Sequence, residues 1–196
     1  MKTITIDSQK YLLPTWEDLD NLCFEMSQKI LKDQKSFDRL VTLIKGGLAF
    51  SRTMCDYLNI KNLSTLQISY YENIGQTKDK PQILQSLPIK ITNEKILLFD
   101  DVVNSGESLK VCLDYLRLQN PASITIASLF LKEKSILKPD YFGALTDVWI
   151  IFPNETRETI ALLTKTWLSS GKTQEEINQN LLSMNFSPPQ LNYFLK

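Results

Sequence analysis

The sequence of 196 residues contains no histidine. Histidine is the usual general base, so its absence excludes the Ser-His and Cys-His pairs of many hydrolases and removes the most common metal ligand. Cysteine is also scarce, since Cys23, Cys55 and Cys112 are far apart and show no metal-ligand spacing. Two of the three lie on apolar helical stripes, which favours a role in core packing. A small, odd number of cysteines is typical of a reducing compartment such as the cytosol.

The sequence also lacks an excess of either charge, because 22 Lys and Arg residues balance 22 Asp and Glu residues. A net charge of zero excludes the broad basic surface that binds nucleic acid or anionic lipid. Long hydrophobic runs are absent as well, so neither a signal segment nor a membrane-spanning stretch is visible. We therefore expect a cytoplasmic protein with no nucleic-acid partner and no membrane partner.

What the sequence does contain is an alternation of apolar strands and amphipathic helices. The pattern predicts strands at residues 40–44, 66–70, 96–99, 123–131 and 148–152, helices at 16–30, 48–58 and 105–118, and a loop at 72–85. Such alternation predicts an α/β fold with a central, mainly parallel sheet flanked by helices. From residue 156 the pattern is only helical. We predict one domain at residues 1–155 and a C-terminal helical appendage at residues 156–196, which is too small to be stable alone.

The strongest functional signal lies in residues 96–109, with the sequence ILLFDDVVNSGESL. An apolar run that suits a buried strand is followed by two carboxylates, Asp100 and Asp101, and by a turn of small residues that opens a helix. Ligands of open α/β sheets bind at the carboxyl ends of strands, and a helix N-terminus offers free N–H groups to a phosphate. Gly106 lets the backbone approach such a ligand closely. The simpler alternative is an acidic turn before a capped helix. Two adjacent acids alone would favour that alternative, but the whole string of strand, acids, turn and helix does not.

This string resembles the signature of the type I phosphoribosyltransferases. In that family two acids contact the ribose hydroxyls of phosphoribosyl pyrophosphate, and the loop that follows holds the 5-phosphate. The resemblance implies that Asp100 and Asp101 bind the ribose. It implies a phosphate loop made of Asn104, Ser105, Gly106, Glu107 and Ser108. It also implies the type I phosphoribosyltransferase fold, with a small hood beside the sheet.

Residues 43–48, LIKGGL, resemble the pyrophosphate loop of the same family. The adjacent glycines Gly46 and Gly47 let backbone amides face an anion, and Lys45 supplies a positive charge. The family often has a cis peptide bond here, so the resemblance implies a cis bond between Lys45 and Gly46. For a Lys-Gly-Gly string on its own, a tight turn is the alternative. The implied catalytic residues are Lys45, Asp100, Asp101 and Asn104.

A third set of residues consists of Lys132, then KPDY at 138–141 and WIIFPNE at 149–155. Together they resemble the base-binding hood of 6-oxopurine enzymes, in particular the xanthine-guanine and archaeal hypoxanthine-guanine types. The resemblance implies that Lys132 meets the purine O6 and that Trp149 stacks on the base. It implies that Ile150 offers backbone groups and that Glu155 reaches the metal or the base edge. An ammonium suits a carbonyl oxygen and an indole covers a flat purine, although Trp149 alone could be a core aromatic. The implied cofactor is Mg²⁺, with Asp100, Asp101 and Glu155 as its candidate ligands.

One residue departs from the 6-oxopurine pattern, because Asn104 stands where the family usually has an aspartate near purine N7. An amide can hydrogen-bond but cannot accept a proton at neutral pH. We predict an enzyme of purine salvage that transfers the phosphoribosyl group to xanthine, guanine or hypoxanthine and releases pyrophosphate. The alternative is a non-catalytic or regulatory protein of the same fold that binds phosphoribosyl pyrophosphate or a nucleotide. A third hypothesis makes the helical appendage an interaction element. We further expect a homodimer, with residues 72–85 as a mobile lid over the substrate.

Overall fold

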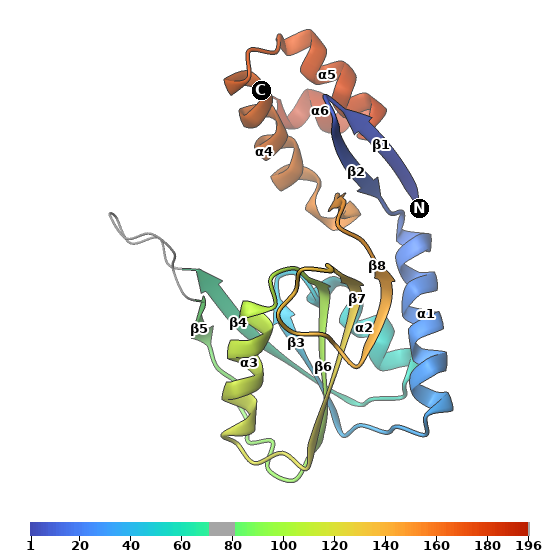
Figure 1. Cartoon of the computed structure of the whole chain (residues 1–196), viewed down its shortest axis with the longest axis vertical. Coiled ribbons are helices and arrows are strands. Elements are labelled where there is room, and N and C mark those ends of the chain that lie inside the picture. The colour runs from blue at the N-terminus through green and yellow to red at the C-terminus, as the bar shows by residue number, and fades with distance from the viewer. Residues whose placement is uncertain (71–80, 196) are drawn as a thin grey trace. The chain divides into compact units, whose positions relative to one another are not determined.

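The structure, a computed structural model, describes residues 1–70 and 81–195 (Figure 1). Packing divides the chain into two compact units. The first, residues 19–147, is called the sheet unit below, and the second, residues 1–18 together with 148–196, is called the hairpin unit. This division differs from the predicted boundary after residue 155, because the first strands of the chain join the C-terminal helices. No helix in the described part of the chain is both long enough and apolar enough to cross a membrane.

The sheet unit is built on six strands in the order β5-β4-β3-β6-β7-β8. Their bounds are Arg39–Ile44 for β3, Asn62–Tyr70 for β4, Pro81–Gln85 for β5, Lys95–Val103 for β6, Ser123–Leu131 for β7 and Tyr141–Leu145 for β8. All neighbouring strands are parallel except β4 and β5, which are antiparallel. The mainly parallel sheet confirms the predicted α/β fold.

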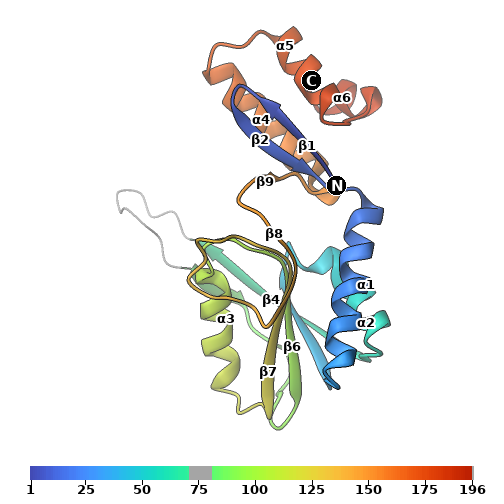
Figure 2. The ribbon, with the colours of Figure 1, turned by 45° about the vertical axis from the view of Figure 1, so that its right-hand side comes forward.

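Helices cover both faces of this sheet. Helices α1 (Trp16–Lys32) and α2 (Leu48–Tyr57) lie on one face and α3 (Glu107–Arg117) lies on the other (Figures 1 and 2). Because both faces are covered, the central strand β6 needs apolar side chains on both of its sides, and residues 96–99 are all fully buried. Burial on both sides of β6 therefore explains why residues 96–99 form a continuous apolar run in the sequence.

The hairpin unit combines a small sheet with the C-terminal helices. The antiparallel strands β1 (Lys2–Ile6) and β2 (Gln9–Leu13) form a hairpin, and the short strand β9 (Trp149–Ile150) pairs parallel to β2. The 3₁₀ turn η1 (Pro153–Glu155) leads into α4 (Thr156–Ser169), which is followed by α5 (Gln174–Ser183) and α6 (Pro188–Phe194).

The helices predicted for residues 156–196 bury their apolar stripes against this hairpin. One core cluster contains Leu13 of β2 together with Ile160 and Trp167 of α4 and side chains of α5 and α6. A capping box begins α5, since the Thr173 side chain accepts a hydrogen bond from Glu176 N and the Glu176 side chain accepts one from Thr173 N. The C-terminal helices therefore share one core with the N-terminal strands.

The sequence prediction differs from the structure at several strands. The hairpin β1–β2 and the edge strand β8 were not expected. Residues 81–85 of the predicted loop form β5, and residues 72–80 of the predicted lid lie outside the described residues. Strand β6 continues to Val103, beyond its predicted end at Phe99, so that Asp100 and Asp101 belong to the strand itself.

Candidate active site

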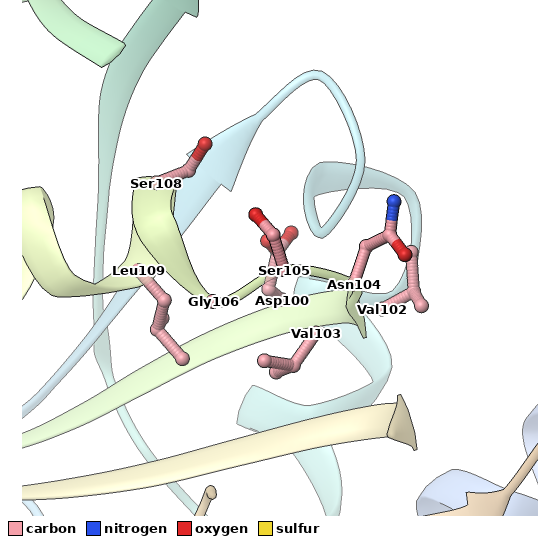
Figure 3. Close-up of a pocket in the computed structure, with 8 residues that line it drawn as sticks. All are labelled: Asp100, Val102, Val103, Asn104, Ser105, Gly106, Ser108 and Leu109. Carbon is pink, nitrogen blue, oxygen red and sulfur yellow. The ribbon is translucent and has the colours of Figure 1, made fainter. Parts of the chain in front are cut away.

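Strand β6 leads directly into a pocket at the segment that the sequence signature marks. The strand carries both acids, the chain turns at residues 104–106, and α3 begins at Glu107. Figure 3 shows the Ser105 and Ser108 hydroxyls and the Asn104 amide on one side of this segment, with Leu109 directed to the other side. The polar side, at the N-terminus of α3, therefore suits an anion. The pocket has a volume of ≈ 170 Å³ and is lined by Asp100, Val102, Val103, Asn104, Ser105, Gly106, Ser108 and Leu109.

Gly106 is required on two grounds. Its backbone is left-handed, with a φ of +86°, which favours glycine. A Cβ at this position would lie 2.7 Å from Ser135 Oγ and 3.0 Å from Leu137 N. The Ser105 carbonyl also accepts a hydrogen bond from Ile136 N at 3.0 Å. Residues 135–137 therefore support the predicted phosphate loop, and no motif in the sequence had indicated that role.

Backbone N–H groups hold the acid pair in place. Asp100 Oδ1 accepts hydrogen bonds from Gly47 N at 3.1 Å and from Asp101 N at 3.0 Å, and Asp101 Oδ1 accepts one from Val102 N at 2.7 Å. Burial raises the pKa of Asp101 to about 6. Burial, together with the charge of Asp101, raises the pKa of Asp100 well above its usual value. Burial therefore favours the protonated form of both carboxyls, and a cation brought close to them would favour the release of their protons.

The loop that follows β3 lies against these acids. A Cβ on Gly46 would be 2.5 Å from Asp101 Oδ1, and a Cβ on Gly47 would be 2.9 Å from the Cα of Asp100. The Asp101 carboxyl leaves no room for a side chain at Gly46, and the backbone of Asp100 leaves none at Gly47, which explains why both positions are glycine. The predicted position of the cis peptide bond is wrong by one residue, because the cis bond joins Ile44 to Lys45. The structure nevertheless brings this predicted loop against the predicted acid pair.

The residues predicted to bind the base belong to different units. Lys132 directly follows β7 in the sheet unit and is half-buried. Burial lowers the pKa of its ammonium, although the charge of Asp147 acts in the opposite direction. Trp149, Ile150 and Glu155 belong to the hairpin unit. Trp149 is 52% exposed, which does not suit a core aromatic, whereas Ile150 is buried and Glu155 is half-buried just before α4.

Residues 15–158, which are most of the chain, match the phosphoribosyl transferase domain family. The chain belongs to this family. The hypoxanthine-guanine phosphoribosyltransferase of Staphylococcus epidermidis is 27% identical over 139 residues, which cover 68% of this chain and 78% of that protein. The crystal structure of the purine phosphoribosyltransferase of Pyrococcus horikoshii aligns with a TM-score of 0.65 at 26% identity, over 73% of this chain and 91% of the other. A Neisseria gonorrhoeae protein with bound ppGpp shares the fold, with a TM-score of 0.67 at 22% identity over 74% of this chain and 89% of the other.

In this phosphoribosyltransferase the acid pair suits a metal that arrives with its substrate. Across residues 1–70 and 81–195, no three His, Cys, Asp or Glu side chains gather where they could hold a metal ion by themselves. Mg²⁺ is usually bound by one or two carboxylates together with phosphate oxygens of the substrate. Asp100 and Asp101 fit that role, while Glu155 is placed in the other unit.

The match to the phosphoribosyl transferase domain family ends at residue 158. Helices α5 and α6, and most of α4, therefore lie outside the matched region. Strands β1 and β2 also precede it, since it begins at residue 15. The segments outside residues 15–158 thus pack together in the hairpin unit.

Proposed function

We propose that the protein transfers the 5-phosphoribosyl group of phosphoribosyl pyrophosphate to a 6-oxopurine base, releasing pyrophosphate, as in purine salvage. The observation that carries the proposal is the hydrogen bond from Gly47 N to Asp100. It joins a glycine loop to an acid pair, and the acid pair leads directly into a pocket at a helix N-terminus. Phosphoribosyl pyrophosphate has the matching order of groups, with sugar hydroxyls between a diphosphate and a phosphate.

Each part of the substrate is assigned to a different part of the site. The 5-phosphate binds the loop of residues 104–108, the ribose hydroxyls bind Asp100 and Asp101, and the diphosphate binds Lys45 and the backbone of Gly46 and Gly47. Asp100 and Asp101 would hold Mg²⁺ together with the substrate, and the metal would neutralise charge on the diphosphate and improve it as a leaving group. The chain itself orients carbon C1 of the ribose, so that a purine nitrogen forms a bond there while the bond from C1 to the diphosphate oxygen breaks.

For the base, we assign Lys132 to the O6 oxygen, Trp149 to stacking and Ile150 to backbone contacts. Glu155 is assigned to the metal or to the base edge. Lys132 is half-buried, and its ammonium suits a carbonyl oxygen. The exposed indole of Trp149 offers surface to a flat ring. The purine and hypoxanthine-guanine enzymes among the similar proteins support a purine as the acceptor.

Asn104 narrows the choice of base further. Its amide is exposed beside the pocket and can hydrogen-bond, but it cannot take the proton that the attacking base must lose. The base must therefore arrive already deprotonated or give its proton to water. Xanthine ionises more readily than guanine or hypoxanthine, so we propose xanthine as the preferred base, with turnover that rises with pH.

A pyrophosphate-release assay with Mg²⁺, phosphoribosyl pyrophosphate and a panel of bases tests the proposal. We expect release with 6-oxopurines, fastest with xanthine, and loss of that release in the Asp100→Asn, Asp101→Asn double variant. Asp114→Asn is the matched control, because Asp114 is an exposed acid of α3 that pairs with Arg117. Release with adenine alone would contradict the assigned base, and no release with any base would contradict an enzyme.

A regulatory protein that binds phosphoribosyl pyrophosphate or a nucleotide without catalysis is the second candidate. Asn104 is the observation that favours it, and the Neisseria gonorrhoeae protein of the same fold has bound ppGpp. Acid–base assistance is typically worth about 10²–10⁴-fold, so Asn104→Asp should raise turnover with guanine and hypoxanthine if the protein is an enzyme. If wild type and Asn104→Asp are both inactive with every base while phosphoribosyl pyrophosphate still binds, the regulatory function is the correct one.

The homodimer and the cytoplasmic location expected from the sequence stay predictions. Light scattering on the purified protein measures the first, with an expected mass twice that of one chain. Cell fractionation measures the second.

A further inference from the structure

Gly47 is the centre of a hydrogen-bond network that reaches beyond the predicted site. Its N–H donates to Asp100 Oδ1 and to Leu43 O, both at 3.1 Å. Its carbonyl accepts from the Ser51 hydroxyl at 2.6 Å and from Ser51 N at 3.1 Å. Ser51 is fully buried in α2. A hydroxyl with no access to solvent is therefore connected to the acid pair through a single glycine.

A second buried hydroxyl faces the same glycine without forming a hydrogen bond. A Cβ on Gly47 would contact Thr42 Oγ1. Thr42 is fully buried in β3, and its hydroxyl has no hydrogen-bond partner among the residues that the structure describes. The two hydroxyls share their burial and their closeness to Gly47, so they differ mainly in the bond that Ser51 makes. Thr42 and Ser51 therefore offer a matched pair of substitutions.

We propose that Ser51 is a positioning residue, which holds the Gly47 carbonyl so that the Gly47 N–H stays on Asp100 and residues 45–47 keep the form that receives a diphosphate. Serine often donates to the carbonyl four residues earlier in a helix, where the bond affects only the helix. Here that carbonyl belongs to the residue whose N–H contacts the acid pair. The inference rests on the proposed function, which supplies the diphosphate as the ligand of this loop.

The composition of the loop explains why it needs an anchor. Two adjacent glycines have wide conformational freedom, and fixing them when a ligand binds costs conformational entropy. A hydrogen bond that already restricts Gly47 in the free protein lowers this cost and strengthens binding. Ser51 should therefore act on the diphosphate end of the substrate and much less on the end that binds residues 104–108.

Calorimetric titration of wild type, Ser51→Ala and Thr42→Val with inorganic pyrophosphate, and separately with ribose 5-phosphate, tests the inference. We expect Ser51→Ala to weaken pyrophosphate binding roughly three- to tenfold, the effect of one hydrogen bond, and to change ribose 5-phosphate binding by less than about twofold. Thr42→Val removes an unpartnered hydroxyl at nearly constant shape, so both affinities should stay at the wild-type level. Ser51→Thr keeps the hydroxyl and should restore pyrophosphate binding.

The possible outcomes are distinguishable. Wild-type pyrophosphate affinity in Ser51→Ala would overturn the role of Ser51 and leave the proposed function intact. Equal weakening of both ligands in Ser51→Ala, with a lower melting temperature, would show a general structural role and would also overturn it. Weakened pyrophosphate binding in Thr42→Val would overturn it too, since that variant removes no hydrogen bond. A wild-type protein that binds neither ligand would overturn the proposed function, and the inference with it.

Discussion

Substitution of Gly106 by alanine tests how the phosphate loop is built. The φ of +86° is strained for any residue that has a Cβ, at a cost of roughly 1–2 kcal/mol. The new methyl group would also meet Ser135 Oγ at 2.7 Å and Leu137 N at 3.0 Å. Leu137 N belongs to the backbone and cannot rotate away, and overpacking of this kind costs about 1–3 kcal/mol. We therefore expect Gly106→Ala to lower the free energy of unfolding by about 2–5 kcal/mol.

Gly171 provides the matched control for the backbone part of this cost. Its φ is +88°, but an added Cβ would meet nothing within 4 Å. Gly171→Ala should therefore cost only the backbone strain, roughly 1–2 kcal/mol. Urea unfolding measures both losses, and calorimetry measures the affinity for phosphoribosyl pyrophosphate. We expect that affinity to fall by about tenfold or more in Gly106→Ala, because small shifts misalign groups that must meet the substrate, and to stay unchanged in Gly171→Ala.

Two results would refute this reasoning. Equal losses of unfolding free energy in the two variants would show that packing against residues 135–137 does not constrain Gly106. An unchanged affinity for phosphoribosyl pyrophosphate in a destabilised Gly106→Ala protein would show that the 5-phosphate does not bind this loop.

Further predictions concern the acids, the base and the C-terminal helices. Replacing Asp100 and Asp101 together by asparagine should weaken phosphoribosyl pyrophosphate binding, since each charge-assisted hydrogen bond contributes about 1.5–3 kcal/mol; calorimetry that gives the wild-type affinity would contradict the assigned site. Burial raises the pKa of Asp101 to about 6 in the folded protein, so its contribution to stability should be lost as the pH rises from about 4 through 6. The urea concentration at the midpoint of unfolding should therefore fall more steeply with rising pH in wild type than in Asp101→Asn. Parallel plots of this midpoint against pH for the two proteins would count against the raised pKa of Asp101. Trp149→Ala should raise KM for the base far more than KM for phosphoribosyl pyrophosphate, and Lys132→Met should selectively impair 6-oxo bases in steady-state kinetics; equal effects on both substrates or on all bases would rule out these contacts. Deleting residues 171–196 should lower Tm, because it removes α5 and α6 from the core shared with the hairpin, and an unchanged Tm in a scanning calorimeter would show that this packing is dispensable.

The strands that could be predicted from the sequence are those whose burial on both faces requires apolar residues throughout. Strands β6 and β7 are buried on both faces, and their continuous apolar runs follow from that burial. The hairpin β1–β2 gives no such signal. It turns at Asp7 and Ser8, both with positive φ, and contains no glycine to mark the turn. Strand β8 lies at the sheet edge and is only partly buried, so its sequence shows no clear alternation.

The same distinction holds in the site. The positions of the two glycine loops could be predicted because close approach to a neighbouring backbone requires glycine, as at Gly47 and Gly106. Ser51 and Ser135 could not be predicted, because each acts through contacts that only the folded chain creates. In the sequence, Ser51 is one polar residue of a helix, and nothing there shows that its hydroxyl reaches the carbonyl of Gly47.

The order of the strands has a consequence for how substrate preference can change. From β3 the chain proceeds outward to β4 and β5, and from β6 it proceeds outward in the other direction to β7 and β8. The segments that leave β3 and β6 therefore turn toward opposite faces, to α2 and to α3 (Figure 1). Open sheets bind ligands at such a topological switch point, whatever side chains surround it. The winding of the chain thus places the proposed sugar-phosphate site at this point, while the proposed base contacts lie on other segments. From the proposed base contacts we therefore expect substitutions at Lys132 or in residues 149–155 to change the preferred base, while the winding and both loops stay unchanged.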